Sequence, residues 1–415
     1  MKQPQHGAWV AWCLTAVFFF CQYMLRSAPA VMMPQLSEAF GLSVAGTASL
    51  IGLFYYGYAV FSLVAGAALD RFGARAVIPL GALAVSAGSF LFGTGSLATA
   101  NSGRVLQGVG GAFALVGAVY IVGRNFPASR VATLIGATQM FGMAGGAAGQ
   151  FVVGPMIAGG LPWKNFWIGA GFASLVITVA LIALLPKERA FKRSGDGMKA
   201  TAAALSTVFR NPQSILCGLI GGLLFIPTTI LDMTWGVRFL QEGHGFDYGE
   251  AVLRSAMVPV GWIIGCPLLG WLSDRLGRRK PVIIAGACVL FACLSWILYG
   301  RPDAIPPYIV GLAAGLASGA AMLPYTVIKE GNRPELGGTA TGVVSFLIFT
   351  FSALLGPVFG WILQRVSGGG QIGLEHYQMT FQPLLYGVGA AIALTFVLKE
   401  TGLAVRVPPE MAKAA

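Results

Sequence analysis

Three ionisable side chains lie deep inside stretches of sequence that are otherwise apolar: Arg26, Arg104 and Asp232. An ionised group is costly in hydrocarbon, so a charged residue that persists there is a candidate for ligand binding or proton transfer. A guanidinium stays charged and offers a planar fork of donors that fits a carboxylate or a phosphate. A carboxylate can accept a proton or bind an ammonium group. These residue types indicate ion recognition rather than covalent catalysis.

Arg26 shares a helical face with polar neighbours, because Gln22 and Tyr23 precede it by four and three positions. A polar face on an apolar helix indicates a cavity lining, so we expect Arg26, Tyr23 and Gln22 to bind an anionic group of a substrate. Two other interpretations stay open. Arg26 could bind backbone carbonyls near Pro29, or it could extend its head group to the membrane interface.

A charged motif occurs twice, at a constant offset of 204 residues. Its leading glycine lets two helix ends approach closely, and its second glycine permits a tight reversal. The aspartate between them can then contact the positive N-terminal end of a neighbouring helix. The repeat therefore predicts two halves of one design and two gating latches, formed by Gly66, Asp70, Arg71, Gly73 and Arg75 and by Gly270, Asp274, Arg275, Gly277 and Arg279.

Asp232 occupies a place in the second half similar to that of Arg26 in the first. Arg26 lies 44 residues before Asp70, and Asp232 lies 42 residues before Asp274. Pseudo-symmetric positions converge on a central site in proteins built from repeats. We therefore expect Asp232 to take up protons in a coupling role or to contact a ligand, and together with Arg26 it would suit a zwitterion. A static Asp232–Arg26 ion pair is the alternative.

The elements that must position these side chains are long apolar segments. Of the 415 residues, 56% are hydrophobic and 10% are charged, which leaves too few charged groups to cover a soluble globule. Segments of about 20 residues can cross a bilayer as helices. Twelve such segments are present, at 9–33, 44–68, 76–95, 97–122, 133–158, 165–185, 214–239, 250–271, 281–300, 305–328, 337–362 and 379–398. The sequence thus predicts an N-terminal bundle over 1–185, a cytoplasmic linker over 186–213 and a C-terminal bundle over 214–415.

The distribution of basic residues predicts the orientation. With both termini cytoplasmic, twenty lysines and arginines fall in cytoplasmic loops and five fall in loops on the other side. The positive-inside rule favours that orientation and explains the formal net charge of +12 without a nucleic-acid partner. The six cysteines lie in apolar runs without C-x-x-C spacing, and the three histidines are scattered, so we expect no metal site and no disulfide. The first apolar run lacks a small-residue cleavage site and is expected to remain as a span.

The repeated G-x-x-x-D-R-x-G-x-R pattern resembles the signature of the major facilitator superfamily. The resemblance covers nearly the whole chain and implies an all-α integral membrane protein, with twelve transmembrane helices in two pseudo-symmetric six-helix bundles around a site of alternating access. The stretch around Arg26 is similar to the first helix of the organic-anion and sugar-phosphate branch. In the seventh span, however, Asp232 stands where that branch would place a second arginine.

Arg104 begins an R-x-x-x-G-x-G pattern that is similar to the fourth helix of this superfamily. The resemblance implies a role in proton transfer or in organising the core, with Gln107 as a polar neighbour. A buried arginine that binds carbonyls of the first helix is the alternative. Further candidates for the cavity lining are Tyr55, Tyr56, Gln139, Tyr325 and Trp235.

These observations predict a secondary transporter of the bacterial inner membrane that moves a small polar anion or zwitterion by proton symport. No G-x-x-x-x-G-K-[ST] motif is present to use ATP, and no enzyme motif is seen, so we expect neither a catalytic centre nor a cofactor. We expect a monomer whose partners are a small molecule, a proton and the lipid bilayer. Residues 154–160 come within one residue of a drug-antiporter signature, so a proton-coupled exporter is the first alternative. A non-transporting membrane sensor is the second.

Overall fold

The computed structural model describes residues 6–42, 44–186, 197–368 and 370–406, and over these ranges it contains helices and no strands. Twelve of the described helices are long and apolar enough to cross a membrane. The expected all-helical membrane fold is therefore confirmed. The helices of the first half are α1 (His6–Val31), α2 (Met33–Phe40), α3 (Val44–Phe72), α4 (Ala74–Gly93), α5 (Leu97–Asn125), η1 (Ala128–Arg130), α6 (Val131–Phe151), α7 (Val153–Ala158) and α8 (Trp163–Leu184).

The second half begins after a helix in the predicted linker, α9 (Gly197–Arg210). Its elements are α10 (Pro212–Ile226), η2 (Pro227–Trp235), α11 (Gly236–Arg238), η3 (Phe239–Gly243), α12 (Tyr248–Leu276), α13 (Lys280–Tyr299), η4 (Pro302–Ala304), α14 (Ile309–Ser318), η5 (Gly319–Met322), α15 (Leu323–Glu330), η6 (Pro334–Leu336), α16 (Gly337–Val366), α17 (Leu374–Val397) and α18 (Leu403–Arg406). Residues 187–196 of the predicted linker lie outside the described residues.

The chain divides into two compact units. The first comprises Met1–Ala128, Phe141–Ser214 and Asn332–Phe349, and the second comprises Ser129–Met140, Ile215–Gly331 and Thr350–Ala415. The first part of α6 thus belongs with the second unit, and the first part of α16 belongs with the first. The two bundles predicted from the sequence, with boundaries at 185 and 214, stay a prediction.

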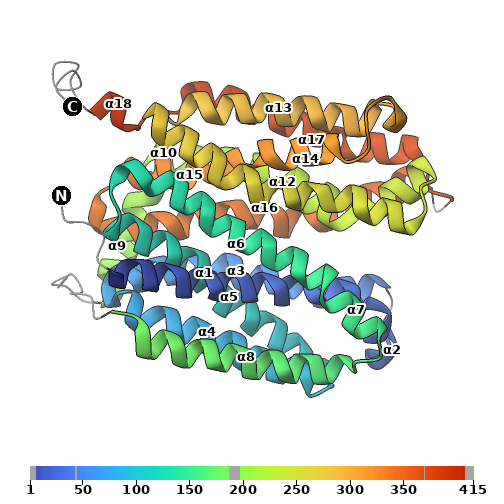
Figure 1. Ribbon diagram of the computed structural model, residues 1–415, viewed down its shortest axis with the longest axis horizontal. Coiled ribbons are helices and arrows are strands. Elements are labelled where there is room, and N and C mark those ends of the chain that lie inside the picture. The colour runs from blue at the N-terminus through green and yellow to red at the C-terminus, as the bar shows by residue number, and fades with distance from the viewer. Residues whose placement is uncertain (1–5, 43, 187–196, 369, 407–415) are drawn as a thin grey trace. The chain divides into compact units, whose positions relative to one another are not determined.

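In the first unit, α5 is the central helix and packs against α1, α3 and α4, while α4 also packs against α8. Figure 1 shows α4 beside α8 in this unit. Helices α4 and α5 approach closely at Gly88, where an added Cβ atom would lie only 2.7 Å from the carbonyl oxygen of Gly103. Glycine at such a crossing lets helices pack at backbone distance.

In the second unit, α12 packs against α14, and α13 packs against both α14 and α17. The span that begins with α10 changes to a π-helix at Pro227 and keeps that form to Trp235. Trp262 of α12 donates from Nε1 to the Thr228 hydroxyl at 2.9 Å, which ties this π-helix to its neighbour. π-Helical turns inside spans are uncommon and occur often at functional sites.

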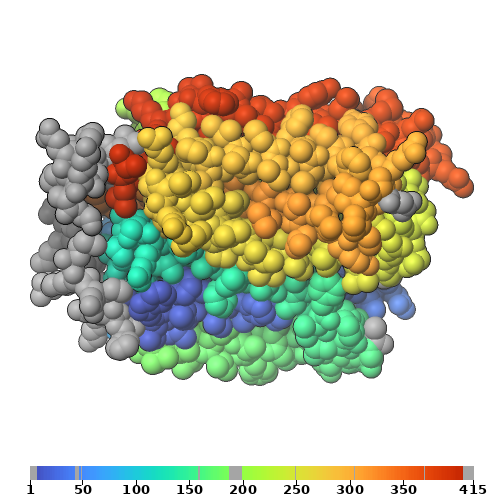
Figure 2. All heavy atoms as spheres, turned by 45° about the horizontal axis from the view of Figure 1, so that its top comes forward, coloured from blue at the N-terminus to red at the C-terminus, as the bar shows by residue number. Residues whose placement is uncertain are grey.

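The outer surface of the second unit is apolar, as a lipid-facing surface requires. Helices α12 and α13, yellow to orange in Figure 2, form part of this surface. The exposed side chains along them include Leu253, Ile264, Val289 and Phe291. The amphipathic helix α9 differs from these spans, because it buries Ala204 and Val208 while Lys199 and Arg210 lie near its ends.

Candidate functional site

Arg26 lies in an aromatic cage within the first unit. Its guanidinium carbon is 4.4 Å from the ring centre of Tyr23, 4.9 Å from that of Tyr55 and 5.6 Å from that of Phe349. Its Nε donates a hydrogen bond to the Tyr55 hydroxyl at 3.2 Å. Three ring faces stabilise the cation electrostatically while they exclude water. The helical spacing of α1 predicted that Tyr23 lies beside Arg26. Phe349 contacts the guanidinium from α16 and was not predicted.

The two terminal nitrogens of Arg26 are buried, and the described residues supply no hydrogen-bond acceptor to either of them. The side-chain amide of Gln22 is also buried, and neither its oxygen nor its nitrogen has a partner there. A buried charged donor without an acceptor costs more than the ~1–3 kcal/mol of an unpaired neutral group. An anion with planar oxygens would supply the missing acceptors in the geometry that guanidinium prefers. Binding of an anionic group by Arg26 stays a prediction, and these unpaired donors are the feature that agrees with it.

Arg104 has a different environment, because it is held by backbone carbonyls. Its Nη1 donates to the Leu25 carbonyl at 3.2 Å, and its Nη2 donates to the carbonyls of Arg26 at 3.4 Å and Ile51 at 3.2 Å. Pro29 has no N–H group, so the Leu25 carbonyl four residues earlier lacks its helical donor. Arg104 supplies that donor. These contacts match the alternative in which Arg104 is a buried arginine that binds carbonyls of the first helix.

Gln107 completes the polar group around Arg104. Its side-chain oxygen accepts from Arg104 Nη1 at 2.7 Å, and its side-chain nitrogen donates to the Ser89 hydroxyl at 3.3 Å. Both side chains are buried. Arg104 and Gln107 thus link α1, α4 and α5 through hydrogen bonds, which is a structural role. Their role in proton transfer stays a prediction.

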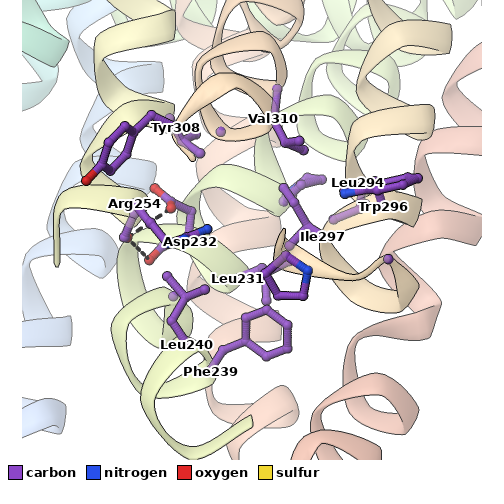
Figure 3. A pocket seen from close by; sticks show the side chains of 18 of the residues that line it. Leu231, Asp232, Phe239, Leu240, Arg254, Leu294, Trp296, Ile297, Tyr308 and Val310 are labelled. Carbon is purple, nitrogen blue, oxygen red and sulfur yellow. Dashed lines mark hydrogen bonds between the residues drawn. The ribbon is translucent and has the colours of Figure 1, made fainter. Parts of the chain in front are cut away.

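Asp232 belongs to the π-helix η2 of the second unit. Its Oδ1 accepts a hydrogen bond from the Ser255 hydroxyl of α12 at 3.0 Å. A Cβ atom added at Gly236 would lie 2.9 Å from that hydroxyl oxygen and 3.3 Å from Oδ1, so glycine leaves the room that this contact needs. The carboxylate lines a cavity within the second unit, shown in Figure 3. Arg26 belongs to the other unit, so the Asp232–Arg26 pair stays a prediction.

The other predicted lining residues differ in exposure. Tyr55 joins the Arg26 cage, and Tyr56 next to it is 51% exposed. Gln139 and Tyr325 are buried in the second unit. Trp235 has a buried indole N–H without a hydrogen-bond partner among the described residues. Their contact with a substrate stays a prediction.

The first latch has the contact that the repeated motif predicts. Asp70 at the end of α3 accepts from the backbone N–H groups of Gly338 at 2.8 Å and Thr339 at 2.7 Å, and from the Thr339 hydroxyl at 2.7 Å. These donors lie at the start of α16, so the carboxylate meets the positive end of that helix. A Cβ atom at Gly66 would lie 2.3 Å from the Gly338 carbonyl oxygen. The contact is confirmed, and its gating role stays a prediction.

The second latch repeats this contact at the start of α6. Asp274 accepts from the N–H groups of Ala132 at 3.4 Å and Thr133 at 2.8 Å, and from the Thr133 hydroxyl at 2.8 Å. Gly270 again allows the approach, because its added Cβ atom would lie 2.4 Å from the Ala132 carbonyl oxygen. The two halves therefore make the same capping contact with different helices.

An ion-pair network distinguishes the second latch from the first. Arg279 donates from Nη1 to Asp274 at 2.7 Å and from Nη2 to Glu330 at 2.8 Å. Burial works against its charge, but the hydrogen bonds and negative charges of Glu330 and Asp274 outweigh that effect and raise the pKa of Arg279 above its ordinary value. In the first half, Arg75 instead donates to the Leu185 carbonyl at 2.8 Å.

The remaining motif residues shape and flank the two turns. Gly73 and Gly277 have φ angles of 78° and 60°, in the left-handed region that favours glycine. The guanidinium carbons of Arg71 and Arg275 lie 5.0 Å and 5.3 Å from the ring centres of their neighbours Phe72 and Trp271. These arginines thus lie beside aromatic rings near the helix ends, and no ion pair is recorded for them within the described ranges.

Several residues of these sites were missed in the sequence. Thr133 and Thr339, the helix starts that the aspartates contact, are themselves separated by 206 residues, and this second repeat could have identified them. Glu400 accepts from the N–H groups of Arg279 at 2.7 Å and Lys280 at 3.1 Å and so caps α13. No pattern in the sequence marks Phe349 or Glu400 as a partner.

Comparison with known proteins gives consistent matches. The model of the Major Facilitator Superfamily matches residues 15–401. The chain is 25% identical to the probable sulfoacetate transporter SauU of Cupriavidus necator, over 91% of each protein. It is 23% identical to the multidrug resistance protein Stp of Mycobacterium tuberculosis, over 76% of this chain and 68% of that protein. The crystal structure of the transporter FucP in its outward conformation shares the fold with a TM-score of 0.71, at 16% identity over 95% of this chain and 100% of the other.

Proposed function

The chain belongs to the Major Facilitator Superfamily, and we propose that it carries a small organic anion or zwitterion across the bacterial cytoplasmic membrane by alternating access. It is a multi-pass membrane transporter and not an enzyme. The substrate class, the coupling to protons and the orientation with both termini inside the cell form the proposal.

The proposal of an anionic substrate rests on one observation, the two terminal nitrogens of Arg26. They are buried and lack an acceptor in the described residues, and three aromatic rings surround them. The guanidinium is planar and presents both nitrogens on one edge, so a bound carboxylate or sulfonate would accept from both at once. The similarity to a sulfoacetate transporter agrees with such a substrate. Burial of these nitrogens without a carbonyl partner in the described residues speaks against the two interpretations in which Arg26 binds carbonyls or reaches the interface.

Proton symport forms the second part of the proposal, with Asp232 as the coupling group. A symporter needs a group that gains a proton when substrate binds and releases it on the other side. Asp232 is an acid placed inside a span, and its Oδ1 has a single hydroxyl donor, Ser255. Its protonation would therefore disturb few protein contacts.

The experiment is anion binding to purified protein with Arg26→Lys. The lysine keeps the charge but cannot reproduce the bidentate fork, so the variant should lose about 1.5–3 kcal/mol of binding free energy. Arg238→Lys is the matched control, since Arg238 is half-exposed and pairs with Glu242 at 2.8 Å. Calorimetry with sulfoacetate, a sugar acid and an amino acid would also rank the substrate classes.

Equal binding by the parent and Arg26→Lys would remove Arg26 as the anchor.

The similarity to a multidrug resistance protein favours one other candidate function, a proton-coupled exporter. Binding of lipophilic drugs, with no binding of the three anions, would favour the exporter.

A further inference from the structure

The second unit contains a cavity whose lining shares no residue with the Arg26 cage. It has a volume of about 130 Å³, and its walls come from η2, η3, α12, α13 and α14 with the loop before α14. Every lining residue falls between Pro227 and Ser318 and so belongs to the second unit. We propose that this cavity binds a small primary ammonium ion that carries one hydrocarbon group, with the Asp232 carboxylate as its counter-ion.

The walls of the cavity are mainly hydrocarbon. Figure 3 shows Leu231, Leu240, Leu294, Ile297 and Val310 among the labelled side chains that line it. Ligand sites of this kind combine an apolar lining with a few placed polar groups. An engineered apolar cavity of roughly 150 Å³ accepts benzene, which sets the size of the group that fits here. A ring of six carbons is therefore the expected hydrocarbon part.

Asp232 gives the cavity its unmatched charge. Its Oδ1 accepts from Ser255, and in the described residues no donor reaches its Oδ2. The side chain is partly accessible rather than sealed. An ammonium group has three donors and no acceptor, so it can bind Oδ2 and pair with the carboxylate. A neutral or anionic ligand of the same shape cannot make that pair.

The other charged group at the wall is already neutralised. Arg254 donates from Nε at 2.9 Å and from Nη2 at 2.7 Å to the same carboxylate oxygen of Glu250, and its guanidinium carbon lies 4.1 Å from the ring centre of Phe246. This pair adds no net charge to the cavity. Of Asp232, Arg254 and His244, which line the cavity, Asp232 is the acid, and its carboxylate favours a cation.

The loop before α14 carries backbone strain. Tyr308 lines the cavity and precedes α14 with a φ angle of 78°, the only positive φ at a non-glycine residue in the described part of the chain. A bulky residue with positive φ is uncommon, and such strain clusters at ligand sites. The strain is a second feature at this cavity, independent of its charge.

Calorimetry on the purified full-length protein in phosphatidylcholine nanodiscs tests the proposal, with benzylammonium as the probe. Benzyl alcohol and benzoate match its shape with no charge and with negative charge. Both should bind roughly tenfold to a hundredfold more weakly, the ratio that a lost charged hydrogen bond gives. This comparison uses the unmodified protein, so it does not depend on the folding of a variant. Equal binding of benzyl alcohol and benzylammonium would overturn the proposal.

Two variants then locate the probe. Asp232→Asn should weaken benzylammonium by a similar factor, and Val310→Phe should exclude it by filling the cavity from α14. Glu375→Gln is the control, because it removes an exposed acid outside the cavity. Arg26→Lys should leave benzylammonium binding unchanged, which separates this site from the proposed anion site. Binding that survives both Asp232→Asn and Val310→Phe would overturn the proposal.

Discussion

Neutralising the two latch aspartates should have unequal effects, although the repeated motif makes them look equivalent. Asp70 and Asp274 each hold the start of a helix through two N–H groups and one threonine hydroxyl. Asp274 also pairs with Arg279, and the two side chains are 3% and 1% exposed. We expect Asp274→Asn to weaken the latched conformation more than Asp70→Asn.

The magnitudes follow from these contacts. Asn at position 70 keeps one acceptor oxygen but turns an NH₂ group toward a backbone donor. The variant therefore loses one hydrogen bond to a charged group, ~1.5–3 kcal/mol, and the attraction to the helix end, ~0.3–1 kcal/mol. Asn at position 274 suffers the same losses and also removes one partner of a buried ion pair, which costs about 3–5 kcal/mol. Glu330, which pairs with Arg279 at 2.8 Å, remains in the variant, so the cost of breaking the ion pair is smaller than this range.

Counterflow in proteoliposomes measures the effect on transport, and calorimetry measures substrate affinity. Transport should fall in the order parent, Asp70→Asn, Asp274→Asn. Substrate affinity should survive, because none of these latch contacts involves a residue of the Arg26 cage. Asp247→Asn is the control, since Asp247 caps only its own helix by accepting from the Glu250 N–H at 3.0 Å. Parental rates in both variants would refute the latch, and a larger loss in Asp70→Asn would refute the role of the ion pair.

Three further predictions test single contacts. Arg104→Leu should lower the melting temperature, and adding Pro29→Ala should recover about 1 kcal/mol because the alanine restores an N–H group that can donate to the Leu25 carbonyl; no recovery would contradict the structural role of Arg104. Asp232→Asn should abolish accumulation driven by a pH gradient and leave counterflow intact, so persistent accumulation would remove Asp232 as the coupling group. Glu400→Ala should destabilise α13 by ~1 kcal/mol in thermal unfolding, and an unchanged melting temperature would show that this cap is dispensable.

The sequence by itself determined the features that depend on local pattern. Long apolar segments separated by short polar turns specify spans, because a bilayer leaves helices as the way to satisfy the backbone. The repeat of Gly66 and Asp70 at Gly270 and Asp274 predicted both the close helix approach and the contact with a helix start. Helical spacing likewise placed Tyr23 beside Arg26. Each inference needed a pattern visible in the sequence and did not depend on which distant residues meet.

Tertiary structure decided which distant groups meet. Arg104 donates to the carbonyl that Pro29 leaves unpaired, across 79 residues of sequence. The sequence offered carbonyls of the first helix as one set of partners but did not identify which carbonyl. Phe349 joins the Arg26 cage from α16. The distinction between Asp70 and Asp274 depends on Arg279, whose counterpart Arg75 binds a carbonyl instead. Equal motifs can thus have unequal energies, because their neighbours differ.

There is a more specific reason why the sequence did not predict where the Asp232 carboxylate points. The pseudo-symmetry argument compared only positions along the chain, 44 and 42 residues before the two motif aspartates, and did not predict which face of the span carries the carboxylate. From Pro227 to Trp235 the span is a π-helix, with hydrogen bonds between residues five apart, so the faces shift along that stretch. Asp232 therefore meets Ser255 and the cavity of its own unit. The sequence determined that an acid lies in this span, and the packing of the span against α12 decided where its carboxylate points.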